Sequence, residues 1–88
     1  MIDLNIKHKE HFDLYLFGSS LYSDTPSDID IAIIYDKRFI NIKQALKYRS
    51  ELLSDLNTKL EMKIDTILLS KEEEIETEFL SNAKHKKL

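Results

Sequence analysis

Apolar residues along the chain fall into blocks with two different spacings. Residues 13–17 and 28–36 are short runs rich in aromatic and β-branched side chains, which is the composition of buried strands. Between them stand the only glycine and the only proline of the chain, Gly18 and Pro26, so this segment is predicted to be the principal loop. Residues 63–69 return to strand composition and predict a third strand.

Elsewhere, apolar residues recur at helical intervals. Asn41 and Gln44 have capping-box spacing, and an amphipathic helix of about five turns is predicted after them. Its apolar stripe, expected to face the core, consists of Ile42, Ala45, Leu46, Tyr48, Leu52, Leu53, Leu56 and Leu60. Ser70 and Glu73 form a second capping box before a shorter helix that carries Ile75, Phe79, Leu80 and Ala83. Residues 1–12 fit either a strand or a helix.

The predicted elements make an α+β domain with a small mixed sheet. The strand after Gly18 is expected to run antiparallel to the one before it, with helices packed on one face of the sheet. Acidic residues at 72–74 and lysines at 84–87 suit the two ends of the last helix. The basic residues at the end of the chain are therefore interpreted as a solvated helix end.

Length and composition narrow the possibilities further. The 88 residues suffice for one domain, 1–88, and 42% of them are apolar. Because the chain has no cysteine, it can form neither a disulfide nor a thiolate metal site. No apolar run approaches the roughly 20 residues of a membrane span, and the first residues lack the pattern of a secretion signal, so a cytoplasmic location is expected. A net charge of −3 argues against extended nucleic-acid binding.

Three aspartates stand where a core-building sequence has no use for them. Asp28 and Asp30 begin one apolar strand and Asp65 lies inside another. Residues two apart on a strand point to the same face, so Asp28 and Asp30 project together. If the strand with Asp65 lies alongside, three carboxylates share one face, an arrangement that divalent cations stabilise. Oxygen ligands favour Mg²⁺ or Mn²⁺.

The loop supplies a complementary group. Gly18 allows close approach of a ligand to the backbone, and Ser19 follows with a hydroxyl and amide donors suited to phosphate. Phosphates held here and bridged by metals on Asp28 and Asp30 would suit phosphoryl or nucleotidyl transfer.

Gly18-Ser19 followed by Asp28-Ile29-Asp30, with a third aspartate on a later strand, resembles the DNA polymerase beta nucleotidyltransferase superfamily. The most similar group is its minimal nucleotidyltransferase branch, and the resemblance covers about residues 14–69. It implies that Gly18 and Ser19 bind the triphosphate. Asp28, Asp30 and Asp65 would hold metal, with Asp65 also helping to activate the acceptor hydroxyl. The eight residues between Ser19 and Asp28 make a short loop, and Leu21 and Tyr22 stand where many members carry a basic residue.

The resemblance implies Mg²⁺-dependent transfer of a nucleoside monophosphate from a nucleoside triphosphate, with ATP favoured, to an acceptor. Minimal members often act as antitoxins that modify a small helical HEPN-type toxin, so a protein partner of that kind is predicted. The alternative is a catalytically inactive module of the same fold that neutralises or scaffolds a partner by binding. Nucleotide addition to an RNA end is a third possibility, and self-association is an option for a domain this small.

Overall fold

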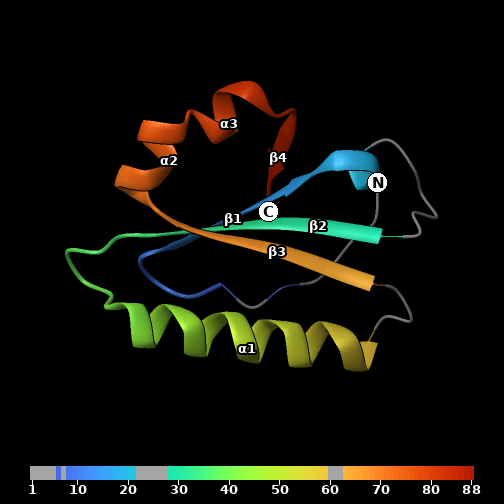
Figure 1. Cartoon of the computed structure of the whole chain (residues 1–88). Helices are drawn as coiled ribbons and strands as arrows, with labels where there is room; N and C mark the ends of the chain where they lie inside the picture. Colours follow the sequence, from blue (N-terminus) through green and yellow to red (C-terminus); the bar gives the residue numbers. More distant parts are fainter. Residues whose placement is uncertain (1–5, 7, 22–27, 60–62) are drawn as a thin grey trace.

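The computed structural model describes residues 6, 8–21, 28–59 and 63–88. Within these ranges a four-stranded sheet has the order β3-β2-β1-β4. The strands are β1 (Phe12–Phe17), β2 (Asp28–Tyr35), β3 (Lys63–Ser70) and β4 (His85–Lys87). The helices are a 3-10 turn η1 (Gly18–Leu21) and three α-helices, α1 (Ile42–Lys59), α2 (Lys71–Thr77) and α3 (Phe79–Asn82). Figure 1 shows their arrangement.

The three longer strands form where the sequence predicts them. β1 and β2 are antiparallel, with Phe17 opposite Asp30, and β2 and β3 are parallel, with Asp30 opposite Asp65. The predicted mixed sheet and the antiparallel pairing across the Gly18 loop are thereby confirmed. Residues 22–27 of that loop, most of residues 1–7 and Leu60 lie outside the described residues, so predictions that concern them stay predictions.

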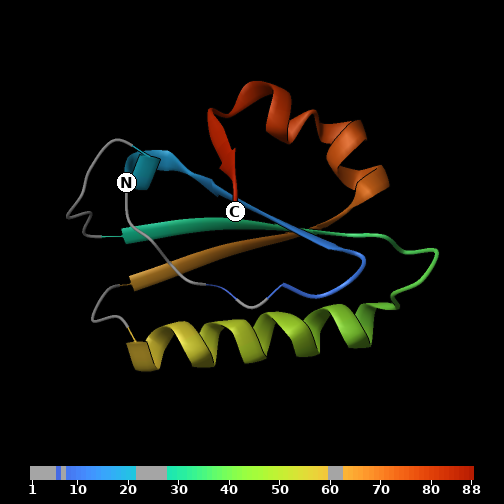
Figure 2. The ribbon, with the colours of Figure 1, turned by 180° about the vertical axis from the view of Figure 1, so that it is seen from behind.

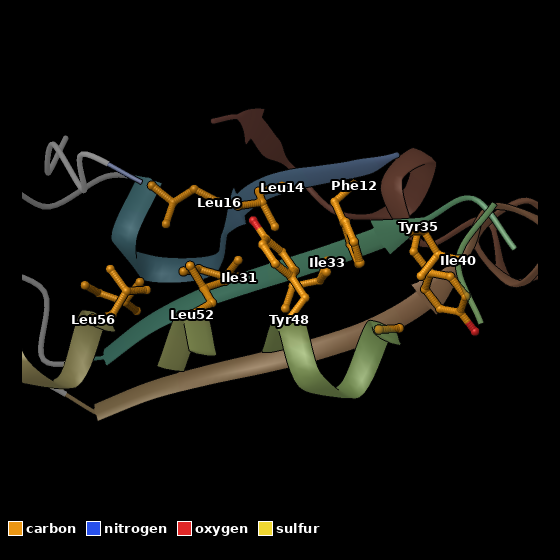
Figure 3. Packing of buried hydrophobic residues seen from close by; sticks show 12 residues of the cluster. Phe12, Leu14, Leu16, Ile31, Ile33, Tyr35, Ile40, Tyr48, Leu52 and Leu56 are labelled. Carbon is orange, nitrogen blue, oxygen red and sulfur yellow. The ribbon is translucent and has the colours of Figure 1, made fainter. Parts of the chain in front are cut away.

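The main core lies between the sheet and α1 (Figure 3). Alternate residues of β1 and β2 point to this face because a strand has a period of two. The buried cluster contains Phe12, Leu14, Leu16, Ile29, Ile31, Ile33, Tyr35, Ile40, Ala45, Tyr48, Leu52 and Leu56. Reciprocal hydrogen bonds between Asn41 and Gln44, of 2.9 and 2.8 Å, confirm the predicted capping box at the start of α1.

Two members of the predicted apolar stripe do not face the core. Ile42 and Leu46 are 54% and 41% exposed, because the first turns of α1 bury only Ala45 and Tyr48. The stripe of the helix is therefore narrower than its apolar content suggests, and the prediction that Ile42 and Leu46 pack inward is wrong.

The C-terminal region also differs from the prediction. The capping box of Ser70 and Glu73 is present, but Glu78 takes the left-handed conformation, with φ of 52°, and separates α2 from α3. Beyond α3, His85–Lys87 form β4 on the free edge of β1 instead of a solvated helix end. The prediction that the lysines complement a helix dipole is wrong, because the open edge of β1 supplies hydrogen-bond partners that override the weak strand propensity of a Lys-rich segment.

Different helices pack on the two faces of the sheet. α1 packs on one face, as expected, while α2 and α3 lie on the other side of the sheet in both views (Figures 1 and 2). On that second face Ala32 and Ile34 of β2 are buried, and the ring of Phe17 meets Phe79 of α3 edge-on at 5.2 Å. The amino-terminal end of β2, with Asp28 and Asp30, is only half-buried.

Candidate active site

Gly18 ends β1 and opens η1 with a φ of 73°, a conformation that side chains with a Cβ rarely adopt. The space beside it is also closed. A Cβ placed there would collide with Oδ2 of Asp30 and lie 3.3 Å from its Cγ. The backbone of Gly18 thus stands directly against a carboxylate of β2, which joins two of the residues predicted to form the site. The structure describes the backbone of Ser19 in η1 but not its side chain, so the role predicted for its hydroxyl stays a prediction.

Asp28 and Asp30 lie on the face of the sheet opposite α1. The isoleucines that alternate with them, Ile29 and Ile31, are completely buried in the core, and this burial fixes the orientation of the strand. A shift of one residue would put both carboxylates into the core, so the register is strongly specified.

Asp65 joins the same face from β3. It stands opposite Asp30 in the parallel ladder, while the neighbouring Ile64 packs against the core cluster. Its side chain is 51% exposed, and Oδ1 lies 3.9 Å from Nζ of Lys63. Asp65 therefore belongs to the carboxylate face and at the same time lies beside the ammonium group of Lys63.

The carboxylates interact electrostatically. Partial burial raises the pKa of Asp30, and the negative charges of Asp65 and then Asp28 raise it further, while Lys63 opposes the shift. A raised carboxyl pKa means that the ionised form is disfavoured by its surroundings. A cation bound between these groups would relieve the repulsion, so this face has the electrostatic character of a cation site.

The donor atoms on this face of the sheet are chemically suited to a divalent metal. Within the described ranges, no three His, Asp or Glu side chains already stand in the arrangement of a metal site. Asp28, Asp30 and Asp65 nevertheless offer only oxygen donors, the kind that Mg²⁺ and Mn²⁺ take. They are neighbours by register on adjacent strands, so the set suits an ion that draws the carboxylates together on binding.

Sequence reasoning missed a fourth member of this part of the sheet. β4 places His85 opposite Phe17, which itself stands opposite Asp30. Asp65, Asp30, Phe17 and His85 therefore form one row across all four strands, which we call the cross-sheet row. The only signal in the sequence is the basic segment at 84–87, whose residue types do not predict a strand.

A strand that ends in a glycine turn, beside carboxylates on the next strand, is an arrangement suited to enzymes that transfer phosphoryl or nucleotidyl groups. The chain matches the family model described as polymerase beta, nucleotidyltransferase, over residues 2–85. It therefore belongs to the polymerase beta nucleotidyltransferase family, and the superfamily indicated by the sequence motifs is confirmed.

No significant match exists among curated proteins or among solved structures. Of the helices in the described part of the chain, none combines the length and apolar character needed to cross a membrane.

Proposed function

We propose that the protein transfers a nucleoside monophosphate from a nucleoside triphosphate, with ATP as the favoured donor, to an acceptor and releases pyrophosphate. The observation that carries this proposal is the contact between Gly18 and Asp30. It brings a backbone able to approach phosphate next to carboxylates able to hold a metal. Membership of the nucleotidyltransferase family supports the same reaction class.

In this proposal each residue has a defined task. Asp28, Asp30 and Asp65 would hold Mg²⁺ or Mn²⁺, which when bound supplies positive charge to the phosphates and to the acceptor oxygen. Gly18 and Ser19 would bind the phosphates, Gly18 through close approach of its backbone. Asp65, the most exposed of the three aspartates on this face of the sheet, would accept the proton of the acceptor hydroxyl.

We propose a protein as the acceptor, of the HEPN-type toxin class that minimal nucleotidyltransferases modify as antitoxins. Support comes from the resemblance of the motifs to that branch. The large apolar side chains of Phe39, Ile42 and Leu46, which are exposed at and before the start of α1, also suit contact with another protein.

The test is transfer of label from α-labelled nucleoside triphosphates, with Mg²⁺ or Mn²⁺, in a lysate of the source cells. Wild type should label a discrete protein band. Asp28→Asn/Asp30→Asn should reduce labelling by at least about a hundredfold, the scale of losing a main electrostatic group in an active site. Asp55→Asn on α1, whose carboxylate pairs with Lys59 at 3.1 Å far from this face, is the matched control.

Two results would contradict the proposal. Equal labelling by wild type and the double variant would remove the aspartates from the reaction. No labelling by either, with a partner that co-purifies equally with both, would instead establish the binding module as the function.

A further inference from the structure

A hollow beside η1 contributes no residue to the nucleotidyl transfer proposed for Gly18, Ser19 and the three aspartates. Its volume is about 770 Å³, and it lies between η1 and the segment that runs from α3 into β4. Leu21 and Leu80 contribute apolar walls, and Lys84 and His85 contribute two basic side chains. Both basic residues are exposed, so an anion could reach them from solvent.

β4 fixes the position of His85. Pairing with Phe17 puts its side chain on the same face as Phe17 and Tyr15, and its ring meets that of Tyr15 edge-on at 5.3 Å. Nδ1 lies 2.8 Å from the carbonyl oxygen of Ala83. Because a carbonyl oxygen can only accept, Nδ1 carries the proton, and Nε2 is the nitrogen that a ligand would meet.

The cross-sheet row changes chemical character from one end to the other. Asp65 and Asp30 make the β3 and β2 end acidic, while His85 with the adjacent Lys84 makes the β4 end basic. His85 is two strands from Asp30, which at about 4.8 Å per strand places their backbones roughly 10 Å apart. Gly18 follows Phe17 directly and so lies between the two ends.

This order agrees with the geometry of the proposed reaction. In nucleotidyl transfer the attacking and leaving oxygens stand roughly in line on opposite sides of the phosphorus. If the acceptor hydroxyl is activated at Asp65, on the β3 side, the leaving group departs toward β1 and β4. The hollow with Lys84 and His85 lies on that side.

We propose that Lys84 and His85 bind the β- and γ-phosphates of the nucleotide and hold the pyrophosphate as it leaves. The proposal rests on the proposed function. The acceptor oxygen forms a bond to the α-phosphorus, and the bond from the α-phosphorus to the oxygen bridging to the β-phosphate breaks. The acceptor proton passes to Asp65, and pyrophosphate leaves with the electron pair of the broken bond. Lys84 donates hydrogen bonds to the leaving pyrophosphate, and His85 donates one from Nε2 when its ring carries both protons.

The experiment measures binding of inorganic pyrophosphate, ATP and AMP in the presence of Mg²⁺ by titration calorimetry. Lys84→Gln/His85→Gln should weaken pyrophosphate and ATP about 10- to 100-fold, the range for losing hydrogen bonds to a charged ligand. AMP should change by less than about twofold, because it lacks the leaving phosphates. Lys84→Gln alone leaves β4 unaltered and should show part of the same loss.

Lys86→Gln is the matched control. Lys86 lies on β4 next to His85, and its change to Gln removes one positive charge, as Lys84→Gln does. Lys86 pairs with Leu16, however, and so belongs to the α1 face of the sheet. All variants should unfold at the same thermal midpoint as wild type. Lys86→Gln should bind pyrophosphate, ATP and AMP with the affinities of wild type.

Three outcomes overturn the inference. The first is that both Lys84 variants bind pyrophosphate as Lys86→Gln does, while wild type transfers label normally. The second is an equal loss for ATP and AMP, which would place these residues at the nucleoside. The third is that wild type neither binds ATP nor transfers label. Failure of both measurements in wild type would contradict the proposed function itself, whereas the first two outcomes contradict only the role of Lys84 and His85.

Discussion

Gly18 meets two demands that no other residue type meets together. Its φ of 73° lies in the left-handed region, and its Cα faces the carboxylate of Asp30 without room for a Cβ. The single glycine of the chain is therefore placed by geometry as well as by the need to end a strand. This contact links the two parts of the candidate site.

Gly18→Ala should destabilise the fold by about 1–2 kcal/mol for the left-handed backbone alone, and more for the displacement of Asp30. Urea denaturation of Gly18→Ala, Asp30→Ala and the double variant measures both parts. In the Asp30→Ala background the cost of the alanine should be smaller by about 0.5–3 kcal/mol, because the clash is gone. Strictly additive effects would show that the Cβ does not meet Asp30.

Asp36 is a second residue whose surroundings decide its chemistry. Its side chain is 5% exposed, and Arg38 donates hydrogen bonds from Nε at 3.0 Å and Nη2 at 2.8 Å to its two oxygens. Nζ of Lys71 lies 3.6 Å away. The side-chain hydrogen bonds from Arg38 hold the pKa of Asp36 well below its ordinary value, against the opposing effect of desolvation. This aspartate thus connects the end of β2 to the start of α2.

A lowered carboxyl pKa in the folded state stabilises the fold at every pH above the ordinary value of 3.8. That contribution is lost as the pH falls toward the folded-state pKa, because the unfolded chain takes up the proton first. Urea denaturation at pH 6 and at successive steps below pH 4 should therefore show a shallower acid decline for Asp36→Asn than for wild type. Parallel declines would show that Asp36 does not contribute to acid unfolding.

At the scale of elements, strand and helix starts were readable from the sequence. Both capping boxes form because Asn41 and Ser70 each have a partner three residues later that can complete the reciprocal bond. The break at Glu78 and the strand β4 were not readable. Glu78 adopts φ of 52° with no glycine to signal it, and β4 exists only because β1 offers an open edge, a long-range condition that local propensity does not contain.

The second capping box gives a prediction for α2. Ser70 Oγ accepts from the amide of Glu73 at 3.1 Å, and Glu73 Oε1 accepts from the amide of Ser70 at 3.0 Å. Ser70→Ala should lower the free energy of unfolding by about 0.5–2 kcal/mol. Thr77→Ala, at the exposed end of the same helix, should stay within about 0.5 kcal/mol. Equal effects in thermal denaturation would show that the cap does not stabilise α2.

At the scale of the whole molecule, one layer of side chains between α1 and the sheet provides most of the burial. The sequence predicted this layer and the opposite carboxylate face, because alternation along β2 separates isoleucines from aspartates. It did not predict which apolar residues of α1 are buried, since Ile42 near the start of the helix and Leu56 near its end are both strongly apolar residue types. Nor did it predict His85 in the cross-sheet row, because that position depends on pairing between residues 17 and 85.

Leu56→Ala should cost about 2–5 kcal/mol, because its side chain is fully buried and leaves a cavity. For a domain of this size that is a large part of the total stability. Ile42→Ala, at 54% exposure on the same helix, should stay within about 0.5 kcal/mol. Chemical denaturation of the pair tests the assignment, and similar losses would place Ile42 in the core after all.

The pairing of β4 with β1 has a kinetic consequence. β1 and β2 meet across a short connection, but joining Phe17 to His85 closes a loop that contains the other two strands and the long helix. Loop-closure entropy must be overcome before such a distant contact is rewarded, so β4 should dock last during folding and detach first during partial opening. In native-state hydrogen exchange, the amide of Leu88, which donates to Leu14 at 2.8 Å, should exchange well before the amides of β2. His85, at the basic end of the cross-sheet row, would then alternate between docked and detached states, while Asp30 and Asp65 at the acidic end stay in place.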